Sequence, residues 1–466
     1  MLIDPKLWQH QKEAVAKARE FDSYALFFEM GCGKTATAIT ILKEKFAAEG
    51  RVMKTLILCP LIVVENWKRE WAMFSRISQL KIQTLTGPGL RRLRDFKEFE
   101  APIVITNLDA ITGIPTLWRE IQARGFECLI VDESHRFKNP KARRTKDLIR
   151  FIDNSKLKHK LILSGTPILN TPLDIWSQFR IMNSKIFGEN YFAFCAKYFY
   201  NANQGNPNAT WPDLRPFPGI EIDIHKKIYS QGMRVEKKDV LDLPPLVRQT
   251  VEVPLSGKQM VLYEQMKKDF ISYMGKHVMV AEMAVTKALR LQQIVSGVFS
   301  NDEGETIPIQ NDRLKALKEV IVGIGKGHKL IIWACFRASY EDIAKVLDGL
   351  DLKWDAIIGG QKVELRQRVV DEFNHGKTQV LIANQGAGGT GVNLTAASYA
   401  IYFSRSFNLE HDQQSEARNH RGGSEIHKKI TRIDLVTPDT IDTYILEALR
   451  QKKNMVKSIM DLKDKL

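Results

Sequence analysis

The sequence predicts an α/β protein built on two parallel sheets. In the first half of the 466 residues, short apolar runs of strand length alternate with amphipathic stretches of helix length. The same alternation returns in the second half after a break. Because parallel strands need a crossover between them, usually a helix, this alternation favours parallel sheets covered by helices.

Five strands are expected in the first half of the chain. Each is a short apolar run bounded by polar residues; the five are residues 24–28, 55–59, 103–106, 127–131 and 160–164. Helices are expected between them at 36–48 and 65–74. A stretch rich in Asn, Gly and Pro at 201–220 predicts a surface loop.

A second α/β unit is expected after a proline-containing break at residues 243–246, which we interpret as an interdomain connection. A long helical region is predicted at 256–298, and an amphipathic helix at 441–466. The expected strands between them are residues 329–334, 354–358, 379–383, 399–403 and 429–436.

These elements predict two domains, which suits a chain of 466 residues. The first is expected at 1–230, with a helical insertion after residue 170. The second is expected at 231–466 and includes a linker and a helical insertion of its own.

The composition is typical of a globular protein, with 44% hydrophobic and 26% charged residues. No apolar run approaches the roughly 18 residues that span a bilayer, and the chain does not start with a basic segment followed by an apolar one. The five cysteines form no CxxC pair, which argues against a zinc site or a disulfide framework. We therefore expect a cytoplasmic protein without a membrane partner, and leave a nuclear location open.

The chain is strongly basic, with 69 Lys and Arg against 54 Asp and Glu, a net charge of +15. Such an excess favours a polyanionic partner such as nucleic acid. A merely basic surface is the alternative.

The first chemical motif is a glycine-rich segment between an expected strand and an expected helix. It reads Met30, Gly31, Cys32, Gly33, Lys34 and Thr35. Glycines let backbone N–H groups approach phosphate oxygens, and the helix that follows directs its positive end toward them. Lys34 then suits the β- and γ-phosphates, and Thr35 suits Mg²⁺. Phe28 stands where the strict pattern has another glycine, so this is a shortened form.

The second motif is a pair of carboxylates, Asp132 and Glu133, directly after the apolar run that ends at Val131. Ligands of open α/β sheets lie at the carboxyl ends of the strands. Asp132 is a candidate for holding Mg²⁺, and Glu133 for orienting a water molecule. A solvated strand end is the alternative, but the pair and Lys34 together, each after a strand, predict nucleoside triphosphate hydrolysis.

The second half contributes a glycine-rich segment at 385–394 and two arginines, Arg418 and Arg421. Their spacing of three predicts that both arginines lie on one face of a helix. Guanidinium groups suit the negative charge that develops on a transferring phosphoryl group. An ordinary loop and a basic surface helix are the alternatives. If the arginines act with Asp132, both halves of the chain must contribute to one ATP site.

Together these motifs resemble those of Swi/Snf-type DNA translocases in helicase superfamily two, and the resemblance extends over about residues 5–455. The segments that carry it are Gln11, 29–35, Cys59-Pro60 with Asn66-Trp67, 131–139, 164–170, 234–240 with 243–245, 291–294, 388–397 and 414–423.

The resemblance implies two RecA-like lobes, the cofactors ATP and Mg²⁺, and double-stranded DNA as the partner. It implies that ATP is bound by Gln11, Met30, Gly31, Cys32, Gly33, Lys34, Thr35 and Gly391. It implies that Lys34, Asp132, Glu133, Arg418 and Arg421 are catalytic, and that Mg²⁺ is held by Thr35 and, through water, by Asp132.

Two further groups of residues receive roles from the resemblance alone. Coupling of ATP to movement is implied for His135, Ser164, Thr166 and Gln414. Contact with DNA is implied for Asn66, Trp67, Thr106, Asn107, Gly389, Asn393, Thr395 and Asn408.

The chain departs from the family pattern at Cys32, Ser134, Phe407 and Ser424. None of these changes removes a charged catalytic group, so an active ATPase is expected. No chromatin-reader module is predicted, and a bacterial or viral-host context is expected.

The predicted function is therefore a DNA-dependent ATPase that moves along duplex DNA and remodels DNA or protein–DNA complexes. A strand-separating or branch-migrating helicase of the same superfamily is one alternative. The others are a DNA-binding scaffold without ATPase activity and an enzyme that acts on RNA.

Overall fold

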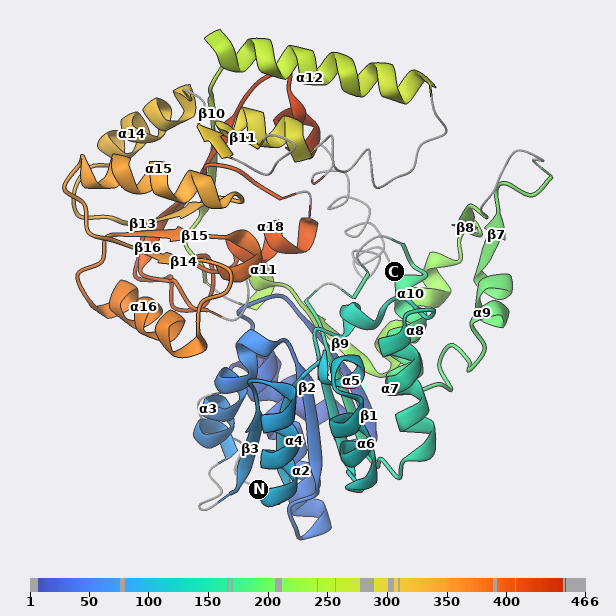
Figure 1. Ribbon diagram of the computed structural model, residues 1–466. Helices are drawn as coiled ribbons and strands as arrows, with labels where there is room; N and C mark the ends of the chain where they lie inside the picture. Colours follow the sequence, from blue (N-terminus) through green and yellow to red (C-terminus); the bar gives the residue numbers. More distant parts are fainter. Residues whose placement is uncertain are drawn as a thin grey trace. The chain divides into compact units, whose positions relative to one another are not determined.

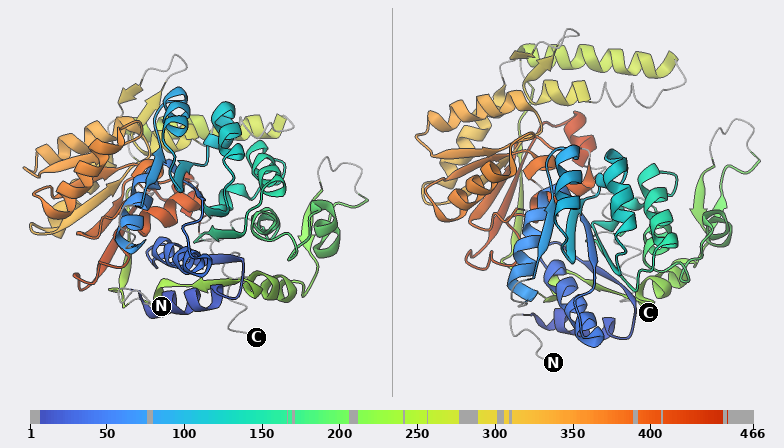
Figure 2. Two further views of the ribbon diagram at one scale, coloured as in Figure 1. Left: turned by 90° about the horizontal axis from the view of Figure 1, so that it is seen from below. Right: turned by 60° about the horizontal axis from the view of Figure 1, so that its bottom comes forward.

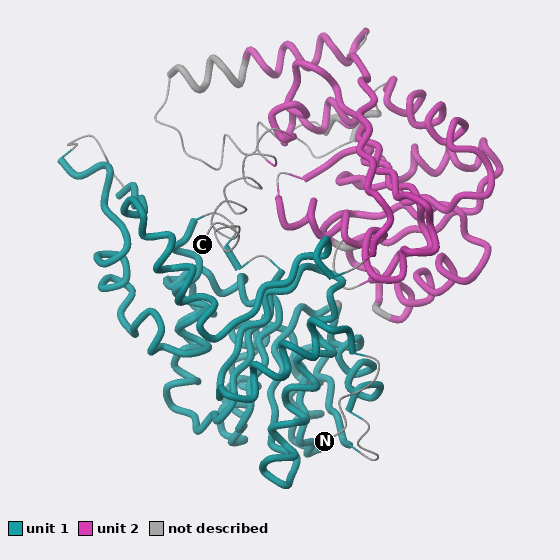
Figure 3. Tube along the Cα trace, turned by 180° about the vertical axis from the view of Figure 1, so that it is seen from behind, with its two compact units in different colours: residues 1–241, 454–466 teal, residues 242–453 magenta. Residues whose placement is uncertain are grey.

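The structure is a computed structural model that describes residues 7–75, 80–165, 167–168, 171–205, 212–240, 242–255, 257–276, 289–300, 306–308, 311–388, 392–406, 408–446 and 449. The described residues form two compact units, one up to residue 240 and one from residue 242 onward (Figure 3). The predicted domain boundary at 230/231 stays a prediction.

Unit 1 contains a seven-stranded sheet in which every pair of neighbours is parallel. Its strands are β1 (Ser23–Phe28), β2 (Thr55–Cys59), β3 (Ile82–Leu85), β4 (Ile103–Asn107), β5 (Cys128–Asp132), β6 (His159–Leu163) and β9 (Gly232–Val235), in the order β3-β4-β2-β5-β6-β1-β9. The five expected strands are present. The edge strands β3 and β9 were missed, because β3 is short and half polar and β9 contains a glycine and an arginine.

Helices cover both faces of the unit 1 sheet (Figures 1 and 2). They are α1 (Gln9–Ala18), α2 (Lys34–Glu49), η1 (Leu61–Val63), α3 (Val64–Ser75), α4 (Gly89–Glu98), α5 (Ala110–Gly113), α6 (Pro115–Ala123), η2 (Ser134–Phe137), α7 (Arg143–Asn154) and α8 (Asp174–Met182). Successive side chains of a strand point to opposite faces. Accordingly, Leu56 and Leu58 of β2 join one apolar cluster, and Ile57 joins the other.

An insertion follows β6 in unit 1. It contains α8, α9 (Tyr191–Tyr198), α10 (Glu221–Ser230) and the short antiparallel pair β7 (Phe199–Asn201) and β8 (Leu214–Pro216), and α11 (Lys237–Val240) ends the unit. Aromatic rings of the insertion pack edge to face, as between Phe179 and Phe187 and between Phe187 and Phe194. This cluster continues into the apolar layer on one face of the sheet. The segment predicted as a surface loop, residues 201–220, thus contains β8 and the last residue of β7.

Unit 2 contains a six-stranded parallel sheet. Its strands are β10 (Leu246–Glu252), β13 (Lys329–Trp333), β14 (Trp354–Ile357), β15 (Val380–Ala383), β16 (Ala397–Tyr402) and β17 (Ile430–Val436), in the order β10-β17-β16-β13-β15-β14. Buried apolar clusters lie on both faces of the sheet. The edge strand β10 was missed, because its side chains are mostly exposed and its sequence is not an apolar run.

Unit 2 also contains the helices α12 (Gly257–Lys276), α14 (Asp312–Ile324), α15 (Arg337–Asp348), α16 (Val363–His375), α17 (Gln385–Gly388) and α18 (Leu409–Glu416), and an antiparallel pair β11 (Val298–Ser300) and β12 (Thr306–Pro308). Residues 289–295 and 441–446 are helical as well. The predicted α/β class with two parallel, helix-covered sheets and helical insertions is confirmed. In the part of the chain that the structure describes, no helix is long and apolar enough to cross a membrane.

Candidate functional site

The glycine-rich loop lies between β1 and α2 at the carboxyl edge of the unit 1 sheet. Gly31 has φ 88° and Gly33 has φ 77°, backbone angles that residues with a side chain rarely adopt. A Cβ atom at Gly33 would also lie only 2.2 Å from Nε2 of Gln11. The turn therefore requires glycine, and it places the first turn of the sixteen-residue helix α2 against the loop.

Lys34 and Thr35 occupy the first turn of α2, and both are half-buried. The Nζ atom of Lys34 donates a hydrogen bond to the Phe28 carbonyl at 2.8 Å. A Cβ atom at Gly165, just after β6, would lie 3.8 Å from this Nζ atom. The ends of β1 and β6 thus meet at the ammonium group of Lys34.

Helix α1 is attached to the same loop through two side chains. Gln11 donates from Nε2 to the Gly33 carbonyl at 3.0 Å and accepts the Trp8 N–H at Oε1 at 2.7 Å. His10 Nε2 lies 2.9 Å from the Cys32 carbonyl, and burial lowers the pKa of His10. The Gln11 amide, predicted to bind ATP, therefore holds the glycine-rich loop in this structure. Met30 is half-buried beside the loop, and the Cys32 side chain lies in the core.

Asp132 is the last residue of β5, and Glu133 follows it directly. The Asp132 side chain accepts the Glu133 N–H at Oδ1 and the Trp67 indole N–H at Oδ2, both at 2.9 Å. Burial and the neighbouring carboxylate of Glu133 raise the pKa of Asp132 to about 6, and the Trp67 hydrogen bond and Lys34 offset only part of this rise. Glu133 has left-handed backbone angles, with φ 52° and ψ 52°, although it is not a glycine.

Glu133 is connected to the end of β6 by a histidine. His135 Nδ1 lies 3.3 Å from Glu133 Oε2 and 3.0 Å from Ser164 Oγ, and His135 and Ser164 are both buried. The predicted coupling residues His135 and Ser164 are therefore in contact beside the carboxylate. Thr166, the third coupling residue predicted in this half, lies outside the described residues.

Gln178, a fully buried residue of α8, was not among the predicted site residues. Its Oε1 accepts the Ser134 hydroxyl at 2.8 Å, and its Nε2 donates to the Pro167 carbonyl. Ser134, noted as a departure from the family pattern, thus connects the acidic segment to the loop after β6. A glutamine on the apolar face of α8 was the available signal.

Most of the DNA contacts predicted in unit 1 are buried. The Trp67 side chain is only 1% exposed, and Thr106 and Asn107 at the end of β4 are also in the core. Asn107 accepts a hydrogen bond from Arg92 of α4 at 2.6 Å. Asn66 is half-buried and donates to Glu70 at 2.7 Å. Helices α3 and α4 pack over these strand ends, so the structure gives the three buried side chains little surface for DNA.

The corresponding residues of unit 2 are more accessible. Asn393 and Asn408 are exposed and Thr395 is half-buried. Asn408 also caps α18 by accepting the Glu410 N–H at 2.9 Å. Gly389 and Gly391, predicted to contact DNA and ATP, lie outside the described residues.

The prediction that Arg418 and Arg421 lie on one face of a helix is wrong. Helix α18 ends at Glu416, and the chain then turns toward Gly423, whose φ is 102°. Arg418 is buried and donates to the carbonyls of Gln414, at 2.9 Å, and Val392, at 3.1 Å. Arg421 is half-buried. The side chain of Gln414 is buried and donates to Glu410 at 2.7 Å.

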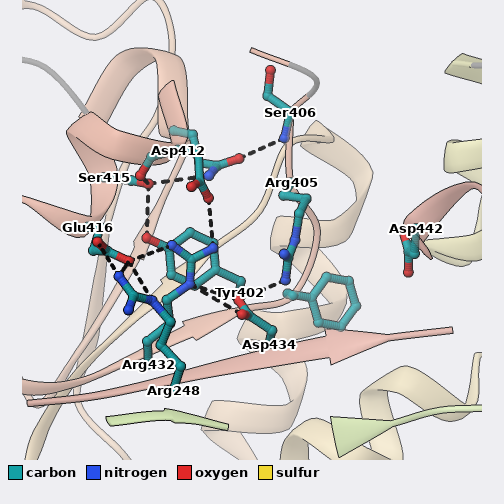
Figure 4. Close-up of polar contacts among 12 residues, drawn as sticks. Arg248, Tyr402, Arg405, Ser406, Asp412, Ser415, Glu416, Arg432, Asp434 and Asp442 are labelled. Atoms are coloured by element: carbon teal, nitrogen blue, oxygen red, sulfur yellow. Dashed lines mark hydrogen bonds and ion pairs between the residues drawn. The ribbon is translucent and has the colours of Figure 1, made fainter. Parts of the chain in front are cut away.

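A group of buried ion pairs joins α18 to the sheet of unit 2, and Figure 4 shows this network. Arg432 on β17 bonds to Asp412 and Glu416 on α18, at 2.7 and 2.9 Å, and to Asp434 at 3.0 Å. The guanidinium carbon of Arg432 lies 3.9 Å from the centre of the Tyr402 ring. The helix that leads to Arg418 and Arg421 is therefore fixed to β17 by charge.

Comparisons with known proteins agree with this architecture. A family model described as the SNF2-related domain matches residues 10–298, and the helicase conserved C-terminal domain matches residues 312–423. The chain is 24% identical to protein p41 of Acyrthosiphon pisum secondary endosymbiont phage 1, over 93% of this chain and 92% of the phage protein.

Other relatives are much longer proteins. The chain is 26% identical to an uncharacterized ATP-dependent helicase of Mycoplasma genitalium, over 97% of this chain and 42% of that protein. It is 25% identical to the nuclear protein STH1/NPS1 of Saccharomyces cerevisiae, over 91% of this chain and 32% of that protein. The chain thus spans less than half of these two relatives.

Among solved structures, the Sulfolobus solfataricus SWI2/SNF2 ATPase core in complex with dsDNA matches with a TM-score of 0.45 and 20% identity, over 99% of this chain and 95% of that chain. The assignment to a family rests on the two family models that match the sequence. Because the SNF2-related domain alone accounts for more than half of the 466 residues, and the helicase C-terminal domain follows it in order, this protein belongs to the SNF2-related family.

Proposed function

We propose that this protein is a DNA-dependent ATPase that couples ATP hydrolysis to movement along double-stranded DNA and thereby remodels DNA or protein–DNA complexes. One observation carries the proposal. Within unit 1, the glycine loop, the ammonium group of Lys34 and the two carboxylates at the end of β5 lie at the same carboxyl edge of one parallel sheet. This is where open α/β sheets bind nucleotides.

The loop suits a triphosphate. Its glycines and the first turn of α2 direct backbone N–H groups outward, and Lys34 adds a positive charge at the same position. Thr35 and Asp132 would hold Mg²⁺, Asp132 through water, and both supply the oxygen donors that this cation prefers. When bound, Mg²⁺ would neutralise charge on the phosphates.

Glu133 suits the role of general base. Its Oε2 atom is buried and has no hydrogen-bond partner among the described residues, and we propose that it takes the proton of the attacking water. His135 lies 3.3 Å from this atom and 3.0 Å from Ser164. We propose that His135 transmits the state of the carboxylate to the end of β6. The predicted catalytic roles of Arg418 and Arg421 and the coupling role of Gln414 stay predictions.

Duplex DNA is proposed as the partner because the chain carries a net charge of +15 and belongs to a family that contains remodelling proteins. Asn393 and Asn408 are exposed and remain the accessible candidates for contact with DNA. We propose a cytoplasmic location in a bacterial cell or viral host, and the match to a phage protein over most of both lengths supports this context.

The test is the rate of phosphate release with duplex DNA, single-stranded DNA, RNA or no nucleic acid, at two salt concentrations. We expect duplex DNA to stimulate the rate most, and we expect the stimulation to weaken as salt rises. Displacement of a third strand from a triplex, without separation of the duplex, is expected in parallel. Unwinding without triplex displacement would favour a strand-separating helicase, and the absence of ATPase activity would favour a scaffold.

A further inference from the structure

We propose that Trp67 is a positioning residue through which helix α3 holds the carboxylate of Asp132, so that duplex DNA acting on α3 also acts on the magnesium site. The inference rests on the proposed function, since it concerns the ATPase and its stimulation by DNA. Its structural basis is one hydrogen bond: the indole Nε1 of Trp67 donates to Oδ2 of Asp132 at 2.9 Å.

The surroundings of this bond leave it little freedom. Trp67 is 1% exposed and Asp132 is 8% exposed. The indole belongs to the apolar cluster between α2, α3 and the sheet, which also contains Trp71 and Ile57. A packed core permits few alternative rotamers, so the ring cannot turn away from Asp132 unless α3 shifts. A hydrogen bond to a charged group is also stronger in such an environment.

The second oxygen of the carboxylate is fixed as well. Oδ1 of Asp132 accepts the N–H of Glu133 at 2.9 Å. One donor therefore comes from α3 and the other from the backbone beside the proposed general base. A carboxylate has about four acceptor positions, so these two bonds orient it and still leave positions for a water-held cation. A neutral indole achieves this without cancelling the charge of Asp132, as an arginine would.

The exposed side of α3 carries two basic side chains, beside the half-buried carboxylates of Glu65 and Glu70. Lys68 and Arg69 follow Trp67 directly and are exposed, and Asn66 precedes it. Because one helix carries these groups and the indole, a displacement of α3 by DNA phosphates moves the Trp67 N–H with it. This arrangement gives α3 two functions, one at each side, and it explains why a residue predicted to touch DNA is buried.

The helix supplies a matched control. Trp71 lies one turn after Trp67, is 0% exposed and belongs to the same apolar cluster. Its indole Nε1 has no hydrogen-bond partner among the described residues. Trp67→Phe and Trp71→Phe thus make similar changes in volume, but only the first removes a bond to Asp132.

The first measurement is the equilibrium affinity for a fluorescent ATP analogue in Mg²⁺ and in EDTA. The quantity compared is the factor by which Mg²⁺ increases this affinity. We expect this factor to fall about tenfold or more in Trp67→Phe, because the variant loses a hydrogen bond to a charged group. We expect Trp71→Phe to keep the wild-type factor. In EDTA, both variants should bind the ATP analogue with the same affinity as the wild-type protein. Equal tightening in both variants would overturn the proposal.

The second measurement is the ratio of ATPase rates with and without duplex DNA. We expect this ratio to fall in Trp67→Phe and to persist in Trp71→Phe; a ratio that persists in both would overturn the link between α3 and the site. Wild-type protein without DNA-stimulated ATPase would instead refute the proposed function. If Trp67→Phe does not fold, as judged by thermal melting, benzothienylalanine at position 67 keeps the shape of the ring and removes the N–H, and the same outcomes apply.

Discussion

The two units fix their predicted catalytic segments in different ways. In unit 1, the Asp132 carboxylate is held by a neutral indole and a backbone N–H. In unit 2, α18 is held by Arg432, which bonds to three carboxylates at once. The side chain that holds Asp132 in unit 1 is neutral, whereas α18 in unit 2 is held by ion pairs.

The difference follows from what each segment has to do. A carboxylate that takes up a cation must keep its negative charge available, and a permanent guanidinium partner would compete with that cation. Helix α18 needs only a fixed position, so paired charges can be used without loss of function. Breaking a buried ion pair by removing one partner is costly, because it leaves an uncompensated charge. We therefore expect changes in unit 1 to alter chemistry and changes in unit 2 to alter stability first.

The largest effect on chemistry is expected for Glu133→Gln. The amide keeps the size of the side chain but cannot accept a proton, so turnover should fall by about 10² to 10⁴ while ATP still binds. Phosphate release and binding of a fluorescent nucleotide measure the two quantities. Substantial DNA-stimulated hydrolysis in this variant would show that another group is the base.

The charged anchor of unit 2 is tested by Arg432→Met. We expect the free energy of unfolding of unit 2 to fall by about 3–5 kcal/mol, since Asp412, Asp434 and Glu416 lose a common partner. Arg248→Ala is the control, because Arg248 bonds to the same Glu416 but its side chain is 53% exposed. Its loss should cost less than about 1 kcal/mol. Equal losses in denaturant titrations would contradict the contrast drawn between the units.

Arg421→Ala tests whether unit 2 also contributes to chemistry. If Arg421 contacts the transferring phosphoryl group, turnover should fall at least about a hundredfold with little change in thermal stability. Arg418→Ala should instead lower stability, because Arg418 donates to the carbonyls of Gln414 and Val392. An unchanged rate in Arg421→Ala would remove this residue from the site.

The smallest effect concerns pH and the phosphate loop of unit 1. Burial lowers the pKa of His10, so the unfolded chain binds a proton more readily than the folded one. The contribution of His10 to the free energy of unfolding is fully present above the ordinary histidine pKa of about 6.5, and it is lost as pH falls below this value. In His10→Gln, the melting temperature should therefore fall less steeply as pH is lowered. A residual slope should remain, because burial also lowers the pKa of His159. An identical slope in both proteins would contradict the assignment.

The sequence predicted the structure well where a feature depends on a single strand or loop. The buried runs before Lys34 and Asp132 read correctly as strands, and the order of the motifs predicted the family, which is confirmed. The edge strands β3, β9 and β10 carry weak patterns, because one side or most of their side chains face solvent.

The sequence could not show contacts between residues far apart in the chain. The Trp67 bond to Asp132 joins positions separated by 65 residues, and the pairing of Gln178 with Ser134 spans 44. Nor did spacing alone reveal that α18 stops at Glu416, because the helix pattern continues in the sequence to Arg421. Such features depend on tertiary packing, which local periodicity does not encode.

The left-handed backbone at Glu133 has a consequence for how the protein would change under selection. A residue with a Cβ in this conformation costs roughly 1 kcal/mol relative to glycine, and asparagine tolerates it better than glutamate does. Glycine or asparagine at this position should therefore stabilise the fold and remove its activity together. A library selected only for folding should drift away from glutamate here, whereas a library selected for turnover should retain it.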